Sequence, residues 1–438
     1  MNKQIVIFGG GTFSHVKNHL ALAPPNLCAT AFGETARRLA ELAEDIMPNL
    51  TVNLKLTKMA DHTSKIITND DLAIEVQKCI ESNLTKIVIM NAALCDFTGI
   101  ISEPRKKMSG IVVYSETKEH GKHAERLQSS LIDGEPYRMD LYPTEKVISK
   151  IRKVRKDIFL IGFKTTTGKS EDEQYIAGLN LLKKNSCNLV LANDVVTRTN
   201  MVITPEEARY HVTTDRDEAL KGLLEMAFYR SHLSFTRSTV VEGTPVPWNS
   251  PEVPDSLRTV VNYCINNKAY KPFNGATVGH FACKLSDQEF LTSIRKTNFN
   301  DLDKNGLVRV KTDGPDTVLA FGAKPSVGGQ SQRIVFNDHQ GYDCILHFHS
   351  EKRKESLVPI VSQRENECGS MECGRATSNG LKQFGNLKAV YLDNHGPNII
   401  FNKNIDPQEV INFIEANFDL STKTGGFVSV DDLPIKQN

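Results

Sequence analysis

The first half of the chain alternates short apolar runs with amphipathic stretches. The apolar runs are found at 4–10, 51–57, 86–94, 158–165 and 187–194. Stretches with apolar residues at helical spacing separate or follow them, at 34–46, 71–82, 172–185 and 217–233. Apolar strands that alternate with helices are typical of a parallel sheet covered on both faces. We therefore predict a doubly wound, Rossmann-like α/β domain that binds its ligand beyond the carboxyl ends of the strands.

The pattern changes after a proline-rich segment. Four prolines fall between positions 245 and 254, where they can neither continue a helix nor occupy the middle of a sheet. Beyond them the pattern predicts a helix at 258–270, short strand-like segments, and a final helix at 407–418. We predict a first domain at 1–235, a linker at 236–256 and a second domain at 257–438.

Composition and charge narrow the class of protein. Lys and Arg number 53 against 52 Asp and Glu in 438 residues, a net charge of +1 that offers no broad surface for nucleic acid or an anionic membrane. The nine Cys are odd in number and scattered, which favours a reducing, cytoplasmic setting. No apolar run approaches the roughly 18 to 20 residues of a membrane span. These features favour a cytoplasmic enzyme that acts on small molecules.

Glycines follow the first predicted strand directly. Gly9, Gly10, Gly11 and Thr12 would let the backbone approach a phosphate, whose charge free amide groups would meet. The alternative is a tight strand connection with no ligand. Three further motifs end predicted strands in this half: NAALCDF (91–97), GFKTTTG (162–168) and LANDV (191–195).

In order and spacing, these four motifs resemble the phosphopantothenoylcysteine synthetase domain, also called the DNA/pantothenate metabolism flavoprotein C-terminal domain. The resemblance covers most of residues 1–230 and implies a carboxylate–amine ligase that uses CTP or ATP with Mg²⁺. It implies that Asp96 helps to hold the nucleotide and its metal, and that Lys106 or Lys107 contacts the triphosphate. The remaining positions implied to form the nucleotide pocket are Gly162, Phe163 and Lys164, which line the base, and Asn193 and Asp194, which close the pocket. The family's N-x-S-S-G segment has no secure counterpart, so nucleotide binding is better supported than ligation with cysteine.

Three histidines carry the chemistry of the second half. His347 and His349 are spaced to point to the same face of a strand, and His395 follows another predicted strand. Three imidazoles suit Zn²⁺ or a similar divalent ion that keeps a position open for substrate. A single histidine is otherwise more often a hydrogen-bonded core or surface residue.

The same half, from about 276 to 418, resembles the class II aldolase/adducin family. The resemblance is carried by ILHFHS (345–350), by NLKAVYLDNHGPNII (386–400), and by FLTSIRKTNFNDL (290–302) and KPSVG (324–328). It implies an α/β domain with a central, mostly antiparallel sheet and a metal on the three histidines. It also implies a site for a substrate phosphate at Gly279, Thr292, Ser293 and Ser326.

The family's catalytic glutamate falls on Gly328, so the usual aldol cleavage is in doubt. The acidic or amide side chains that offer substitutes are Gln330, Gln332, Asp338 and Glu372. Other members of the family carry out epimerisation or dehydration, or are not catalytic.

Two hypotheses follow. The first is a bifunctional metabolic enzyme, in which a nucleotide-dependent ligase-like domain is fused to a metal-dependent aldolase, epimerase or dehydratase-like domain acting on a phosphorylated or nucleotide-linked molecule. The second is a regulatory protein that binds nucleotide and metal at degenerate sites. Both resemblances imply a homo-oligomer, a dimer or a tetramer, whose other partners are small molecules.

Overall fold

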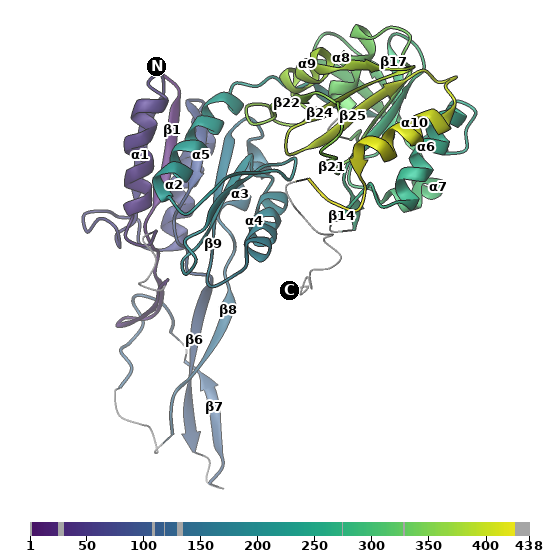
Figure 1. Cartoon of the computed structure of the whole chain (residues 1–438). Coiled ribbons are helices and arrows are strands. Elements are labelled where there is room, and N and C mark those ends of the chain that lie inside the picture. Colours follow the sequence, from purple (N-terminus) through teal and green to yellow (C-terminus); the bar gives the residue numbers. More distant parts are fainter. Residues whose placement is uncertain are drawn as a thin grey trace. The chain divides into compact units, whose positions relative to one another are not determined.

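The structure is a computed structural model, shown in Figure 1, that describes residues 2–24, 30–106, 110–117, 119–128, 135–273, 275–326 and 329–424. The chain divides into two compact units. Unit 1 comprises Met1–Val202 and His211–Ser231, and unit 2 comprises Ile203–Tyr210 and His232–Asn438. The sequence predicted a first domain at 1–235, a linker at 236–256 and a second domain at 257–438. These bounds and the role of each domain stay predictions. Among the described residues no helix is long and apolar enough to cross a membrane.

Unit 1 is built on a seven-stranded sheet with the order β12-β11-β10-β9-β5-β1-β4. Its strands are β1 (Gln4–Gly9), β4 (Thr51–Leu56), β5 (Thr85–Met90), β9 (Phe159–Thr166), β10 (Leu189–Asp194), β11 (Asn200–Ile203) and β12 (Arg209–Thr213). The consecutive strands from β4 through β1, β5 and β9 to β10 all pair in parallel. The predicted parallel sheet of an α/β fold is confirmed.

Three of the five described helices of unit 1 begin at side chains that cap their free backbone amides. The five helices are α1 (Glu34–Ile46), α2 (Asn69–Glu81), α3 (Ser149–Val154), α4 (Glu171–Asn185) and α5 (Arg216–Arg230). Capping boxes at Thr68 and Ser170 start α2 and α4, and Asp215 caps α5. Helix α1 packs on β1 and β4, and α4 packs on β9 and β10. The helical spacing seen in the sequence therefore buries one face of α1 and of α4 against the sheet.

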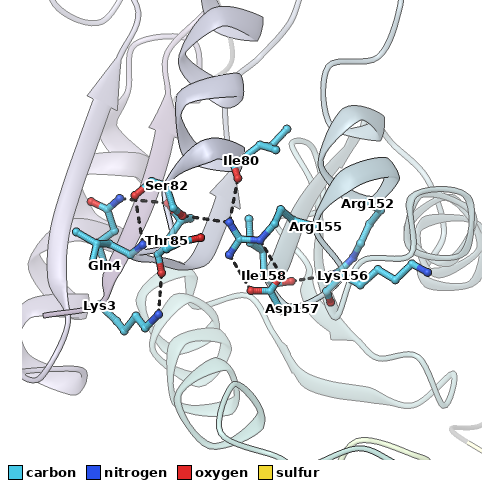
Figure 2. A network of polar contacts seen from close by, with 12 residues as sticks. Lys3, Gln4, Ile80, Ser82, Thr85, Arg152, Arg155, Lys156, Asp157 and Ile158 are labelled. Atoms are coloured by element: carbon cyan, nitrogen blue, oxygen red, sulfur yellow. Dashed lines mark hydrogen bonds and ion pairs between the residues drawn. The ribbon is translucent and has the colours of Figure 1, made fainter. Parts of the chain in front are cut away.

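A polar network fixes the amino-terminal ends of three neighbouring strands, β1, β5 and β9 (Figure 2). The Arg155 guanidinium donates to the carbonyl oxygens of Ile80 and Ser82, at 2.9 and 3.1 Å, and pairs with the Asp157 carboxylate at 2.7 Å. This ion pair lowers the pKa of Asp157. Because the strands are parallel, the network lies at the end opposite the predicted ligand edge, and it is structural.

Short antiparallel sheets complete unit 1. Strand β6 (Phe97–Lys106) pairs with β7 (Val112–Glu116) and β8 (Arg138–Pro143), and β2 (Ser14–Lys17) pairs with β3 (Leu20–Leu22). In Figure 1, β6, β7 and β8 form a long ribbon that extends away from the seven-stranded sheet. These antiparallel strands were not predicted from the sequence.

Unit 2 is built on a ten-stranded sheet whose main path runs β13-β19-β18-β17-β16-β20-β25-β24-β22, with β23 on β24. The strands are β13 (Arg237–Val241), β16 (His280–Lys284), β17 (Glu289–Ser293), β18 (Leu307–Thr312), β19 (Thr317–Phe321), β20 (Cys344–His347), β22 (Ile360–Val361), β23 (Lys382–Phe384), β24 (Leu387–Leu392) and β25 (Gly396–Phe401). Only the two ends of this path, β13 and β22, pair in parallel among the described strands. The predicted mostly antiparallel sheet is confirmed.

Helices and two small ladders surround this sheet. The helices are α6 (Asp255–Asn266), the short 3₁₀ helix η1 (Phe299–Asp301), α7 (Leu302–Asn305), α8 (Gly329–Asp338), α9 (Met371–Gly380) and α10 (Pro407–Asn417). The ladders join β14 (Pro272–Phe273) to β15 (Ala276–Thr277), and β21 (Glu351–Lys352) to β26 (Phe418–Asp419). Within the predicted linker, Arg237–Val241 forms β13, and Val246 and Trp248 belong to the core of unit 2. Most of that segment therefore packs as part of unit 2.

Candidate functional site

The three predicted histidines converge in unit 2. His347 is the last residue of β20, His349 follows it by two positions, and His395 directly precedes β25. Strands β20 and β25 pair antiparallel with His347 opposite Asn398, which brings the two chain segments together. The three side chains are 1%, 5% and 2% exposed. The sequence spacing therefore yields a buried cluster of imidazoles.

The distances within this cluster suit a metal ion. One ring nitrogen from each histidine lies within 4.8 Å of the other two. His347 Nε2 and His395 Nε2 are 3.2 Å apart. Two nitrogens bound to one tetrahedral zinc at about 2.05 Å would be separated by about 3.3 Å. The His cluster, His347 with His349 and His395, could thus hold a divalent metal.

The protonation state of His347 also suits metal binding. Its Nδ1 donates to the carbonyl oxygen of Pro397 at 2.8 Å, the tautomer that this network implies, which leaves the Nε2 lone pair facing the cluster. Burial lowers the pKa of His347 to about 4, although the Pro397 carbonyl opposes that shift. The ring is therefore neutral at physiological pH, as a metal ligand must be.

Two glycines let the backbone close around the cluster. Gly396, next to His395, has a φ of +133°, and a Cβ there would lie 2.1 Å from the carbonyl oxygen of Phe348. Gly279 has a φ of +114°, and a Cβ there would lie 2.6 Å from the carbonyl oxygen of His347. Both positions require glycine because any side chain would meet backbone.

A fourth histidine lies beside the cluster. His280, on β16, is in register with His347 on β20, and their ring centroids are 4.8 Å apart. Its Nδ1 is 2.7 Å from Gln332 Nε2. Burial, followed by the neighbouring His347, lowers the pKa of His280 well below its ordinary value. No sequence pattern marked this histidine as a neighbour of the cluster, because strand register is not visible in a sequence.

The residues predicted to bind a substrate phosphate each make a different contact in the structure. The Thr292 hydroxyl is buried and donates to the carbonyl oxygen of Phe281 at 3.1 Å, so its hydrogen is used inside the sheet. Ser293 is also buried, and its Oγ has no partner among the described residues. The Ser326 amide donates to the carbonyl oxygen of Ser293 at 2.9 Å, which joins these two loops, while Gly279 packs on the His347 backbone. Phosphate binding by this set stays a prediction.

Position 328, where the family's glutamate would stand, lies outside the described residues, as does the side chain of Gln330. Among the other substitutes, Asp338 accepts a hydrogen bond from Ser378 at 2.6 Å, and Glu372 accepts one from the Ser234 amide at 3.0 Å. Gln332 contacts His280. Of the named substitutes whose side chains the structure describes, Gln332 is the one linked to the cluster, through His280.

In unit 1 the backbone amides of the glycine turn already donate hydrogen bonds within the protein. The amides of Gly10 and Gly11 donate to the carbonyls of Thr30 and Ala31, at 3.1 and 2.8 Å, and the Thr12 amide donates to Ala93 at 3.1 Å. A Cβ on Gly9 would lie 2.1 Å from that of Ala36 on α1. The expected free amides are not found here, and the glycines serve close packing. A role in nucleotide binding stays a prediction.

Asp96 is exposed and its carboxylate pairs with Lys146, which sequence reasoning missed. Its side chain is 60% exposed, so burial does not demand a cation there. Lys107 and the side chain of Lys106 lie outside the described residues. The pairing of Asp96 with Lys146 places a carboxylate and an ammonium just beyond the carboxyl end of β5, the edge at which a ligand was expected.

The positions predicted to line a nucleotide pocket lie on the neighbouring strands β9 and β10. Phe163 on β9 is paired with Leu191 on β10, and the neighbouring Lys164 is likewise half-buried. Gly162 is buried with the Leu181 side chain beside it. Asn193, farther along β10, accepts a hydrogen bond from the Thr165 hydroxyl at 3.3 Å. Gly162 and Phe163 lie in the middle of β9, whereas Asn193 lies at the end of β10, and a nucleotide pocket formed by these positions stays a prediction.

Asp194 anchors the loops beyond β9 and β10. It is 2% exposed and accepts hydrogen bonds from the Thr166 hydroxyl and from four backbone amides, those of Gly168, Lys169, Val196 and Thr197, at 2.9 to 3.0 Å. Burial raises its pKa, but the hydrogen bonds outweigh burial and leave the pKa of Asp194 well below its ordinary value. This carboxylate orders the edge of the predicted pocket.

Replacing Asp194 with alanine is expected to lower the free energy of unfolding by about 3 kcal/mol, because buried amides lose a charged acceptor. Since the folded pKa is depressed, the contribution is present above the unfolded value of about 3.9 and is lost as the pH falls further. Urea unfolding at pH 7 and at pH 3 measures both effects. The exposed Glu171 on α4, replaced by alanine, is the control, with a loss below about 1 kcal/mol. An equal loss in both variants would contradict the role of Asp194.

Comparisons with known proteins found a curated relative and several similar solved structures. No family model matches it. The coenzyme A biosynthesis bifunctional protein CoaBC of Thermococcus kodakarensis is 30% identical over 94 residues, which cover 22% of this chain and 23% of that protein. The chain thus matches less than a quarter of that relative's length.

Two solved structures are similar at low identity. The DNA/pantothenate metabolism flavoprotein of Streptococcus pneumoniae is 20% identical, with 53% of this chain and 100% of that chain covered and a TM-score of 0.40. L-fuculose 1-phosphate aldolase is 16% identical, with 37% and 82% covered and a TM-score of 0.29. The two structures bear the names of a DNA/pantothenate metabolism flavoprotein and of an aldolase, the kinds of protein named in the two resemblances.

Proposed function

We propose that this chain is a bifunctional metabolic enzyme whose second unit uses a divalent metal, Zn²⁺ by its ligand type, on a small-molecule substrate. The observation that carries the proposal is the convergence of His347, His349 and His395 as buried rings with nitrogens within 4.8 Å of one another. Three neutral imidazoles form a typical ligand set for a catalytic zinc with an open position.

A metal bound there would act as a Lewis acid that polarises a substrate carbonyl. The residues of this chain define the rest of the site. Pro397 holds the Nδ1 proton of His347, so that the opposite nitrogen keeps its lone pair. Gln332 orients His280 beside the cluster, and the two side chains offer polar contacts to a bound molecule. Aldolase, epimerase or dehydratase chemistry on a phosphorylated or nucleotide-linked substrate is the reaction class we propose.

For unit 1 we propose a nucleotide-dependent ligase that joins a carboxylate to an amine, with CTP or ATP and Mg²⁺. The similarity to CoaBC over 94 residues supports this reading. Asp96 and Lys146 stand at the ligand edge of the sheet, where one would meet the metal and the other the phosphates. We further propose a cytoplasmic homo-oligomer, a dimer or tetramer.

A second candidate is nucleotide binding without turnover, which the lack of a secure counterpart of the N-x-S-S-G segment favours. The amides of Gly10, Gly11 and Thr12 are all engaged within the protein, so a bound phosphate would take its donors from other residues. Under this alternative, unit 1 senses a nucleotide rather than consuming it.

Release of pyrophosphate separates the two candidates. The full chain is incubated with Mg²⁺, with CTP or ATP, and with panels of carboxylates and amines. Pyrophosphate formed in step with an amide product supports the ligase. Saturable nucleotide binding without pyrophosphate supports the sensor, and the absence of both contradicts nucleotide use by unit 1.

A further inference from the structure

A tight turn places a buried glutamate in unit 2. The segment Ile203–Tyr210 belongs to unit 2, although the residues before and after it belong to unit 1. Thr204 closes the turn, since its amide donates to the Ala208 carbonyl at 3.2 Å and its hydroxyl accepts from the Ala208 amide at 3.2 Å. Glu207, inside the turn, has a φ of +69°. A left-handed glutamate is strained, so the surrounding contacts must hold it in place.

Glu207 forms an ion pair in the interior with a lysine near the end of the described chain. Its Oε2 lies 2.5 Å from Lys423 Nζ, and the two side chains are 0% and 1% exposed. Among the described residues, the carboxylates more than nine-tenths buried are Asp194, Glu206 and Glu207. A buried ion pair is seldom more stabilising than apolar side chains of the same volume, so its presence calls for another explanation.

The segment that carries Lys423 runs along the residues that follow His349. Strand β26 pairs with β21, which begins two residues after His349. The Glu351 amide donates to Thr422 Oγ1, and the Thr424 amide donates to the carbonyl oxygen of His349, both at 3.3 Å. Lys423 therefore lies between Thr422 and Thr424, the two residues that form hydrogen bonds with Glu351 and His349.

A second buried lysine holds the same segment. Lys271 Nζ donates to the carbonyl oxygen of Leu420 at 2.5 Å, and the Lys271 side chain is 3% exposed. Near the contact, Ser350 Oγ and Thr424 Oγ1 are buried without a partner among the described residues. The segment 418–424, which we call the clasp, is thus fixed by buried charge on one side and lies on the backbone of His349 on the other.

We propose that Glu207, through Lys423 and the clasp, is a positioning residue for His349 in the metal site. The inference rests on the proposed metal function of the His cluster. Loss of either charge removes this buried ion pair, and with it a contact that holds Lys423 and the clasp in the interior. The clasp can then shift and move Lys423 towards water. That movement would take Thr424 off the His349 carbonyl and loosen one of the three metal ligands.

Zinc affinity of the full chain, measured by competition with a chromophoric chelator, tests this inference. Glu207→Gln and Lys423→Met are each expected to weaken zinc binding by about 10- to 100-fold, the effect typical of residues that orient metal ligands. The double variant is expected to bind more tightly than the product of the single effects predicts, because both changes remove the same ion pair. Asp287→Asn, which breaks the exposed pair with Lys284 in the same unit, is the control and should stay within about 2-fold of the wild type.

The outcomes separate the inference from the proposed function. A wild-type chain that binds no zinc contradicts both. A wild-type chain that binds zinc, with Glu207→Gln within about 2-fold of it, overturns the positioning role alone. A merely structural role for the pair would lower the melting temperature and leave the zinc affinity of the folded protein unchanged. If Glu207→Gln yields no folded protein, Glu207→Asp keeps the charge but shortens its reach, and its zinc affinity is compared with that of the wild type, again with about 2-fold as the limit.

Discussion

Replacing His347 with alanine is expected to lower the zinc affinity of the full chain by more than about 100-fold. The change removes one of three ligand nitrogens, which should cost more than the roughly 10- to 100-fold lost when a group that orients a ligand is removed. His347 has the closest contact within the cluster, with its Nε2 3.2 Å from that of His395. Chelator competition and the metal content of dialysed protein measure the effect.

The control for this variant is His62→Ala, which removes an exposed imidazole from unit 1. It should leave both the affinity and the number of bound ions unchanged. Equal zinc binding by His347→Ala and the wild type would show that any bound metal lies elsewhere. The His cluster would then be a packed core feature.

Gly396→Ala is expected to lower the free energy of unfolding by about 3 kcal/mol or more and to weaken zinc binding as well. The residue combines a φ of +133° with a Cβ position 2.1 Å from the Phe348 carbonyl oxygen, so alanine meets both backbone strain and a collision. Relief requires that the chain next to His395 and the chain between His347 and His349 move apart. Urea unfolding and zinc titration on the same variant measure the two effects.

Gly314→Ala isolates the backbone strain from the collision. Gly314 has a φ of +104°, but the nearest atom to a Cβ there is 4.0 Å away. The expected loss is about 1 to 2 kcal/mol, with zinc binding unchanged. Equal losses in the two variants would contradict the claim that Gly396 exists for close approach to the metal site.

The local sequence pattern predicted the main helices and strands well, because helices and strands bury apolar residues at different spacings along the chain. The helical spacing at 34–46 coincides with α1, and the apolar run at 187–194 contains β10. His347 and His349 could be paired from sequence because residues two apart on an extended chain share a face. The antiparallel β6–β8 sheet was missed because β8 is exposed throughout and β7 is at most half-buried, so neither outer strand buries an apolar face.

Residues that meet through tertiary structure could not be predicted. His280 reaches the cluster only because β16 pairs with β20 in one register. Lys146 pairs with Asp96 across a loop and three strands, and Glu207 pairs with Lys423 from far along the chain. No local sequence pattern marks such pairs. The position of Glu207 in a short turn before a strand is one weak signal.

The glycine turn and the proline segment show why local rules are ambiguous. A G-G-G-T turn predicts free amides, but carbonyls of Thr30 and Ala31 satisfy them from a segment whose path the sequence does not reveal. Prolines predicted a linker at 236–256, yet β13 pairs in parallel with β19 and Trp248 is 4% exposed. Proline excludes helix interiors, but it does not prevent the residues around it from packing.

The metal content of the purified full chain tests the central claim most directly. Inductively coupled plasma mass spectrometry, after dialysis against metal-free buffer and reconstitution with Zn²⁺, gives the number of ions per chain. We predict one tightly bound ion in the wild type and none in a variant with alanine at His347, His349 and His395. A wild type without bound ion, or a triple variant that retains it, would contradict the assignment of a metal-dependent site to unit 2.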